Sequence, residues 1–477
     1  MSPEDYASQD ATGLAGLVRR GEVTPDELAR LALEAIATVN PRINCVIDCF
    51  IERAEGLPVR PDGPLGGVPY LGKDLPFEKG VKAEMGSQLA QGYVCTEDTE
   101  LAIRLRRAGA VNLGRTTTSE FALAAATENR LTGRTCNPWN PDRSVAGSSG
   151  GAAASVASGI VPFAQGSDAG GSIRMPASFC GLVGLKPTRA RVPLAPAPTL
   201  AYAGLNNVFV LTRSVRDCAA VLDAVEGPAR GDAVEIPRPA RPYCSEIERV
   251  HGPLRIGFTD EAWSGLTVDR DVAEAVRRTA VLCESLGHHV EEAAPAFDYE
   301  PYIAAQKVLW QSFTAHDIAA VARELGRTPG LDNLQTTTWN CYRRGMALEA
   351  GALMAALDVY NEITRAVGAF WDHYDILLTP TCTIAPRPLG TFDPDGEGAD
   401  LFDQLGAHET FTALFNATGQ PAISLPLEES DDGMPVGMQF VGRFGDEATL
   451  LRLAVELEQA RPWALRRPAV HVANLTG

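Results

Sequence analysis

Lysine is nearly absent from this chain. Of its 42 basic residues only five are lysines, namely Lys73, Lys79, Lys82, Lys186 and Lys307. An arginine stays protonated in proteins, whereas a buried lysine can lose its proton and act as a base. A lysine retained at a structured position is therefore a candidate catalytic group. We attribute Lys79, Lys82 and Lys307 to composition alone.

Positive charge is in deficit as well. The formal net charge is -18 and the pI is near 4.9, which argues against nucleic acid and anionic membranes because both require basic surfaces. No stretch is long and apolar enough to span a membrane. The acidic beginning of the chain, with Glu4, Asp5 and Asp10, lacks the apolar run of a secretory signal. We expect a cytoplasmic protein with neither partner.

Metal-binding patterns are missing. The ten cysteines form no C-x-x-C pair and are scattered along the chain, so we expect reduced thiols and neither a disulfide framework nor a zinc site. The seven histidines show no metal-ligand spacing, and none of them falls in the first 250 residues. We therefore expect no metal and no cofactor.

The shortage of histidine bears on nucleophilic catalysis. A Ser-His-Asp triad stays open because its members assemble in space, and G-x-S-x-G occurs around Ser149. The strand that should precede such an elbow is not evident in 143–146, which disfavours this interpretation. S-x-x-K is also absent, which disfavours penicillin-binding and β-lactamase chemistry. A nucleophilic serine would then need a distant lysine as its base, and Lys73 is our candidate.

What the chain does contain is alternation of strand and helix patterns, which predicts an α/β fold. Helices are expected over 10–40 (two of them), 99–108, 271–286 and 450–457, and strands over 44–47, 68–71, 110–113, 254–258, 289–292 and 376–378. The Pro- and Gly-rich segment 386–406 is expected to be a loop. The length allows two or three domains or one large unit.

A glycine-rich stretch surrounds Lys73. Residues 66–74 nearly match the phosphate-binding pattern G-x-x-x-x-G-K-[ST], but Asp74 replaces the hydroxyl residue and Pro69 removes a backbone donor. The better interpretation is a strand that ends in a buried lysine.

A second stretch, 144–189, is dominated by glycine, serine and alanine but is interrupted by apolar runs, unlike a flexible linker. Within it, Gly170 and Gly171 allow the backbone N–H groups beside Ser172 to turn towards one point, as in an oxyanion hole. Asp168 and Arg174 bracket this turn and are expected to pair. A tight structural turn with an N-cap serine is the alternative for Gly-Gly-Ser by itself.

Together these residues resemble the amidase signature family. The matching pieces are GSSGG, D-x-GGSIR, PAS-x-CG and GLKPT within 147–188, the lysine motif at 67–74, and shorter pieces at 118–121, 137–139, 379–381, 415–426 and 433–439. The ordered set is very specific and covers nearly the whole chain. It is most similar to the branch that hydrolyses nylon oligomers.

The resemblance implies a Ser-cisSer-Lys triad. Ser172 is the implied nucleophile, Ser148 the bridging serine on a cis peptide, and Lys73 the base. The oxyanion is expected to be held by the N–H groups of Ala169, Gly170, Gly171 and Ser172. Supporting roles are expected for Asp168, Arg174 and Ser149.

The resemblance also implies one α/β/α domain over 1–477, with a mixed sheet between helices. The signature core is expected at about 66–190, and variable segments that form the substrate pocket at about 190–250 and 295–370. Residues that could line this pocket are Trp310, Phe313, His316, Trp339 and Cys341.

The implied activity is hydrolysis of a small aliphatic, cyclic or aryl amide through an acyl-enzyme. A homodimer is common in the family. A glutaminase subunit of a tRNA-dependent amidotransferase is the alternative function, and the acidity of the chain counts mildly against it. A non-catalytic scaffold is disfavoured because Lys73, Ser148 and Ser172 are all retained.

Overall fold

The chain folds around one mixed sheet. The computed structural model describes residues 1–54, 62–396 and 399–475, and there the sheet has eleven strands in the order β1-β3-β2-β6-β8-β7-β12-β13-β11-β9-β10. In chain order they are β1 (Val46–Cys49), β2 (Pro69–Lys73), β3 (Val111–Thr116), β6 (Phe163–Asp168), β7 (Val183–Lys186), β8 (Asn207–Thr212), β9 (Arg255–Phe258), β10 (His289–Glu292), β11 (Ile376–Pro380), β12 (Ala422–Glu429) and β13 (Pro435–Gly442). The α/β class predicted from the sequence is confirmed.

Strand direction decides which segments meet. β2 runs parallel to β3 and β6, and β9 runs parallel to β10 and β11, whereas the other neighbouring pairs are antiparallel. The carboxyl ends of parallel neighbours lie at the same edge of a sheet. Lys73, the last residue of β2, therefore lies beside the segment that follows Asp168, the last residue of β6.

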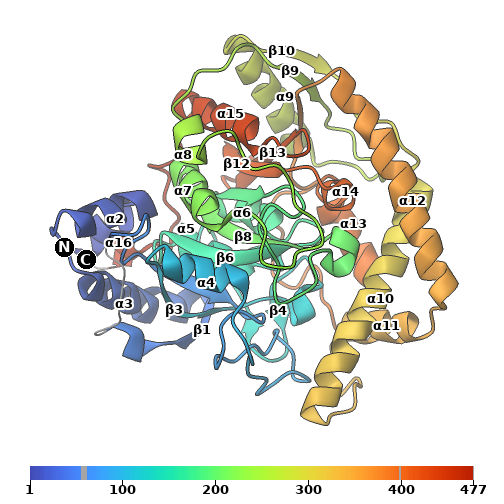
Figure 1. Ribbon diagram of the computed structural model, residues 1–477, viewed down its shortest axis with the longest axis horizontal. Helices are drawn as coiled ribbons and strands as arrows, with labels where there is room; N and C mark the ends of the chain where they lie inside the picture. Colours follow the sequence, from blue (N-terminus) through green and yellow to red (C-terminus); the bar gives the residue numbers. More distant parts are fainter. Residues whose placement is uncertain (55–61, 397–398, 476–477) are drawn as a thin grey trace.

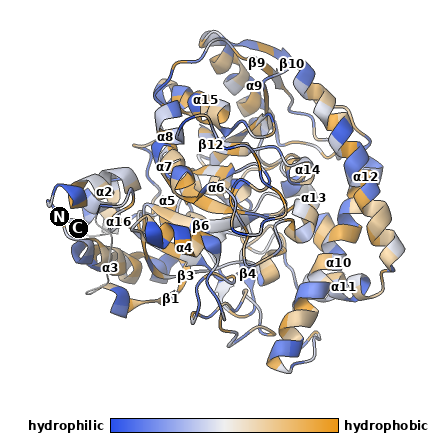
Figure 2. Cartoon of the chain, viewed as in Figure 1, coloured by the Kyte–Doolittle hydropathy of each residue, from blue (hydrophilic) through white to orange (hydrophobic). Residues whose placement is uncertain are grey.

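Helices flank the sheet (Figure 1). Those close to it are α3 (Pro25–Ile43), α4 (Glu100–Arg107), α5 (Gly150–Ala157), α6 (Arg174–Cys180), α7 (Val215–Val225), α9 (Arg270–Ser285), α14 (Ala413–Thr418) and α15 (Glu447–Ala460). Every residue of α5 is buried. Figure 2 shows hydrophobic colour concentrated on the central strands and helices, so the core lies between the sheet and these helices.

Two groups of helices lie at opposite ends of the molecule (Figure 1). At one end are α1 (Pro3–Ser8), α2 (Ala11–Arg19), α3 and the last helix, α16 (Val472–Leu475). At the other end α10 (Tyr299–Leu325), α11 (Thr336–Met346) and α12 (Ala350–Gly368) form an arm. The arm occupies the part of the sequence expected to be variable. No helix of the described residues meets the length and hydropathy needed to cross a membrane.

Local sequence explains several boundaries. Thr24 caps α3 by accepting a hydrogen bond from the Glu27 N–H, and Thr99 caps α4 in the same way through Ala102. The predicted helices and strands all occur, with shifts of a few residues at their ends. The loop prediction for 386–406 is wrong in part, because α13 (Leu401–Glu409) begins inside it. Asp400 accepts from the Phe402 N–H and starts that helix.

Candidate active site

Three segments converge around Lys73. Its ammonium group lies at the end of β2, the segment 146–149 leads into α5, and Ser167 belongs to β6. The Lys73 Nζ is 2.6 Å from Ser148 Oγ, 2.9 Å from Ser149 Oγ and 2.9 Å from Ser167 Oγ. The lysine is 1% exposed, so these three hydroxyls replace water around its charge.

The environment of Lys73 favours the neutral amine. Burial lowers the pKa of Lys73 to about 7, although the Asp168 carboxylate acts in the opposite direction. A neutral amine has two N–H donors and one lone pair, so one of the three hydroxyls can then donate to the nitrogen. Lys73 can therefore accept a proton from a serine near neutral pH. Its position inside the protein does not suit the phosphate-binding interpretation of residues 66–74.

The segment before α5 brings Ser148 to Lys73. The peptide bond between Gly147 and Ser148 is cis, and the Ser148 carbonyl accepts a hydrogen bond from Thr118 Oγ1 at 3.0 Å. A β-carbon at position 147 would lie 2.6 Å from the carbonyl oxygen of Ala124. Glycine is therefore required here by the close approach of two backbones. In the described residues only isolated bridges, not a strand, precede Ser149, which does not suit the nucleophile elbow.

Ser172 lies in the turn between β6 and α6. Gly171 has φ +142°, a conformation that L side chains rarely adopt. Ser172 is 6% exposed, and its carbonyl accepts from the Ser149 N–H at 3.3 Å. The turn thus binds the segment that carries Ser148. Within the part of the chain described here, no hydrogen bond joins the hydroxyls of Ser172 and Ser148; such contacts are often long in structures without substrate.

An ion pair fixes the shape of this turn. Arg174 binds the Asp168 carboxylate through Nε at 2.9 Å and through Nη2 at 2.8 Å, and both side chains are fully buried. Burial alone would raise the pKa of Asp168, but Arg174 outweighs it and holds that pKa at about 2. The pair therefore stays charged. The predicted pairing of these two residues is observed.

The residues that surround this pair were not predicted from the sequence. Arg174 also donates to the Thr412 carbonyl, to Gln439 Oε1 and to Asn416 Oδ1, at 2.9, 2.8 and 2.6 Å. Thr412 Oγ1 in turn donates to the Gly170 carbonyl at 2.5 Å. Asn416 and Gln439 fall inside matched pieces of the family pattern, which was a usable signal. Thr412 carried no signal.

The suggested pocket residues have different surroundings. Trp310 and Cys341 are buried, and Phe313 and Trp339 are half-buried, on α10 and α11. His316 is exposed, so the suggestion that it lines a pocket is wrong. The reason is helical geometry, since His316 projects from the opposite side of α10 to the buried positions Trp310 and Ala315.

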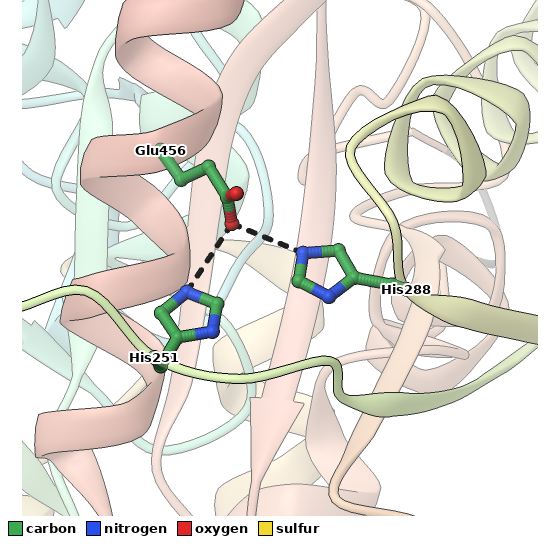
Figure 3. A group of neighbouring side chains, drawn as sticks. All are labelled: His251, His288 and Glu456. Atoms are coloured by element: carbon green, nitrogen blue, oxygen red, sulfur yellow. Dashed lines mark hydrogen bonds and ion pairs between the residues drawn. The ribbon is translucent and has the colours of Figure 1, made fainter.

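A second polar cluster lies away from these serines. Figure 3 shows His251 and His288 beside Glu456, with each histidine Nε2 close to Glu456 Oε2, at 3.2 and 3.0 Å. Sequence spacing did not indicate this grouping, because its members come from segments before β9 and β10 and from α15. The Leu254 N–H donates to His288 Nδ1, so a neutral His288 carries its proton on Nε2 and donates it to Glu456.

That tautomer decides how we interpret the cluster. A metal-ligating histidine offers an unprotonated nitrogen to the ion and donates its other N–H elsewhere, which is the reverse of the arrangement at His288. His251 Nδ1 faces the Gly252 carbonyl at 3.0 Å, and the two rings stack. We assign the cluster to holding the segment before β9 against α15.

The fold and the serine–lysine site define a class of protein. The Amidase family model matches residues 27–451, and the chain belongs to this family, the amidase signature hydrolases. It is an amide hydrolase that acts on carbon–nitrogen bonds.

Individual relatives narrow the comparison. The chain is 38% identical to the 6-aminohexanoate-cyclic-dimer hydrolase of Paenarthrobacter ureafaciens, with 96% of each chain covered. A solved structure of 6-aminohexanoate cyclic dimer hydrolase complexed with substrate superimposes with a TM-score of 0.91, at 36% identity and over 97% of this chain and 99% of that one. The matching component of the glutamyl-tRNA(Gln) amidotransferase of Thermotoga maritima is less similar, with a TM-score of 0.76 and 27% identity over 99% and 98% of the two chains. Amide hydrolysis is thus supported over the glutaminase alternative.

Proposed function

We propose that this hydrolase cleaves a small aliphatic, cyclic or aryl amide with Ser172 as nucleophile, Ser148 as bridge and Lys73 as base. The observation that carries the proposal is the 2.6 Å contact between Lys73 Nζ and Ser148 Oγ, made by a lysine whose pKa burial lowers to about 7. A base with a pKa near the working pH transfers protons most effectively. The similarity to the cyclic-dimer hydrolase supports a cyclic or linear aliphatic amide as substrate.

The reaction proceeds through an ester of Ser172. The Ser172 hydroxyl gives its proton through Ser148 to neutral Lys73, and Ser172 Oγ forms a bond to the amide carbonyl carbon. The backbone N–H groups of 169–172 stabilise the resulting oxyanion. The carbon–nitrogen bond then breaks, and the proton returns from Lys73 through Ser148 to the leaving nitrogen.

Water completes the cycle. It attacks the ester carbonyl, its proton passes to Lys73 by the same route, and the carbon–Oγ bond breaks. Ser172 regains a proton, and a carboxylic acid leaves. The ion pair of Asp168 and Arg174 contributes by holding the turn that presents the N–H groups.

Replacement of the nucleophile tests this mechanism. Ser172→Ala is expected to reduce amide hydrolysis to background, with an unchanged circular-dichroism spectrum and melting temperature. The matched control is Ser155→Ala, because Ser155 is also buried and its hydroxyl donates only to the Ala152 carbonyl inside α5. A hydrolysis screen over lactams, linear aliphatic amides and anilides provides the measurement. Full activity in Ser172→Ala contradicts the mechanism.

The remaining proposals concern the setting of the enzyme. We propose a cytoplasmic location, supported by ten cysteines that are all unpaired, and a homodimer, supported by the family resemblance. The segments 190–250 and 295–370 are proposed to form the substrate pocket, within one domain that spans 1–477 and has its signature core at about 66–190. The mass of the isolated chain by light scattering tests the dimer.

A further inference from the structure

One face of α10 carries polar atoms that have no partner. Tyr302, Gln306 and Trp310 are spaced four residues apart, so they lie on the same side of the helix. They are 3%, 4% and 3% exposed. Tyr302 Oη, Gln306 Oε1 and Trp310 Nε1 have no hydrogen-bond partner within the described part of the chain. Each such group costs about 1–3 kcal/mol when it stays unpaired, which points to a partner from outside the chain.

Glu409, the last residue of α13, presents a similar group next to the catalytic turn. Its side chain is buried, and within the described residues its Oε2 has no hydrogen-bond partner. A β-carbon at Gly170 would lie 2.6 Å from Glu409 Oε1. The carboxyl group therefore rests against the backbone of Gly170, one of the residues that surround the oxyanion.

The two sets of atoms belong to the same region. Ala169, the neighbour of Gly170, packs against the two hydrophobic clusters that contain Trp310 and Tyr302. The rings of Tyr302 and Tyr360 stack at 6.0 Å, and the charge of Glu409 acts on both phenols. Tyr360 Oη is also buried and has no partner among the described residues. These unpartnered donors and acceptors thus surround the turn that carries Ser172.

The protonation state of Glu409 defines what it can bind. Burial, reinforced by the Asp168 charge and opposed by Arg174, raises the pKa of Glu409 to about 8. At pH 7 the carboxyl group is therefore mainly neutral. A neutral carboxyl has one O–H donor and one carbonyl acceptor. A secondary amide has one N–H donor and one carbonyl acceptor, so the two groups are complementary.

We propose that Glu409 and the face of α10 formed by Tyr302, Gln306 and Trp310 bind a second, non-scissile amide group, so that the enzyme selects neutral diamides over monoamides of equal size. This inference rests on the proposed function, because the first amide must lie at Ser172. Substrates that end in a carboxylate are disfavoured by Asp168 and by any ionised Glu409. Substrates that end in an ammonium lack the carbonyl that the Glu409 hydroxyl needs as acceptor.

A matched pair of substrates provides the test. One is a macrocyclic diamide, and the other is the mono-lactam of the same ring size in which two methylene groups replace the second amide. The readout is the ratio of kcat/KM for the diamide to that for the mono-lactam. Glu409→Leu is expected to lower this ratio about tenfold to a hundredfold, since it removes both hydrogen bonds. Glu409→Gln keeps one donor and one acceptor and is expected to keep the ratio within about threefold.

A second variant and a control accompany these. Trp310→Phe removes only the indole donor and is expected to lower the ratio about threefold to tenfold. It answers the question if Glu409→Leu fails to fold. The control is Glu458→Gln, because burial also raises the pKa of Glu458 to about 7 but this residue lies on α15 and accepts from the Val215 N–H. Its ratio should not change.

The pH dependence separates binding from a merely structural role. The ratio should fall above about pH 8 in the unaltered enzyme, as Glu409 ionises, and should stay flat in Glu409→Gln. Titration of Lys73 affects both substrates and cancels in the ratio. Asp168 stays ionised and Arg174 charged, and burial raises the pKa values of Tyr299, Tyr302, Tyr360 and Cys382 above their usual range.

Failure of this inference differs from failure of the mechanism. Equal ratios for the unaltered enzyme and Glu409→Leu, or loss of the preference in Glu409→Gln, overturn the diamide site even when both compounds are hydrolysed. If neither compound is hydrolysed, calorimetric binding of the two compounds to Ser172→Ala gives the affinities directly. Tighter binding of the diamide, abolished by Glu409→Leu, then supports the site independently of turnover, and equal affinities overturn it.

Discussion

At the scale of single residues, Lys73 is the group on which the chemistry depends. It follows four apolar or small residues of β2 and is surrounded by serine hydroxyls instead of carboxylates. A carboxylate within hydrogen-bonding distance would hold the ammonium charged, whereas hydroxyls satisfy the amine without fixing its charge. The carboxylate that acts on it from further away, Asp168, is occupied by Arg174. Lys73 can therefore release and regain a proton near neutral pH.

This environment predicts a pH profile and a substitution effect. Since only neutral Lys73 acts as a base, kcat/KM should rise with pH through about 7 and then level off. Lys73→Met should lower kcat at least about 10³-fold. It should not lower the melting temperature: the folded-state pKa lies below the unfolded value of 10.5, so burying the lysine costs stability at neutral pH, and methionine removes that cost.

The control for this prediction is Lys79→Met, at an exposed position. It should leave the pH profile, the rate and the melting temperature unchanged. Steady-state kinetics between pH 5 and about 9 together with thermal melts provide the measurements. A Lys73→Met enzyme with normal activity would show that another group is the base.

At the scale of elements, the catalytic turn is held from outside by α14 and β13. Arg174 begins α6, yet its contacts reach Thr412 and Asn416 at α14 and Gln439 on β13. Asn416 also donates to the Asp168 carbonyl at 2.9 Å. The turn between β6 and α6 is short and contains two adjacent glycines, so it needs such external contacts to keep its N–H groups aimed at one point.

Breaking this ion pair should unfold the support of the turn. Arg174→Met leaves the Asp168 carboxylate buried without its partner and is expected to lower the free energy of unfolding by about 3–5 kcal/mol. Arg255→Met removes an exposed pair with Asp375 and should cost no more than about 1 kcal/mol. Urea denaturation of both variants measures the difference. Equal losses in the two variants would contradict the importance assigned to the buried pair.

At the scale of the whole molecule, the two ends of the chain close the same side of the sheet. Figure 1 places the two termini beside each other, with α16 next to α1 and α3. The Val472 N–H donates to the Ser158 carbonyl at 2.9 Å, and the Tyr6 hydroxyl donates to the Ile160 carbonyl at 2.9 Å. Both termini therefore pack against the segment between α5 and β6, which leads directly to the catalytic turn.

The C-terminal segment should consequently stabilise the entire domain. Trp463 is buried and its indole N–H donates to the Arg213 carbonyl at 2.8 Å. Trp463→Ala is expected to lower the free energy of unfolding by about 3–5 kcal/mol and to speed proteolysis of the N-terminal helices. Leu465→Ala, at a position that is 89% exposed, should change stability by no more than about 0.5 kcal/mol. An unchanged melting temperature in Trp463→Ala would show that the end is not part of the cooperative unit.

Some features were determined by the sequence alone. Alternating patterns predicted the α/β class because apolar periodicity is a local property of the chain. The rarity of lysine and the ordered motifs were enough to propose Lys73, Ser148 and Ser172, since each residue type carries its chemistry with it. The strand over 68–71 was predictable from its apolar residues, and so was the burial of the lysine that follows it.

Only the tertiary structure decided what surrounds those residues. Thr412, Asn416 and Gln439 reach the catalytic turn across 238 to 265 positions of sequence, and Glu409 reaches Gly170 across a similar separation. No local pattern encodes these contacts, because they arise where β13 and α14 are placed beside α6 by the pairing of β7 with β12 and of β12 with β13. The same holds for the unpartnered face of α10, since a helix pattern predicts which residues are buried but not whether their polar atoms find a partner.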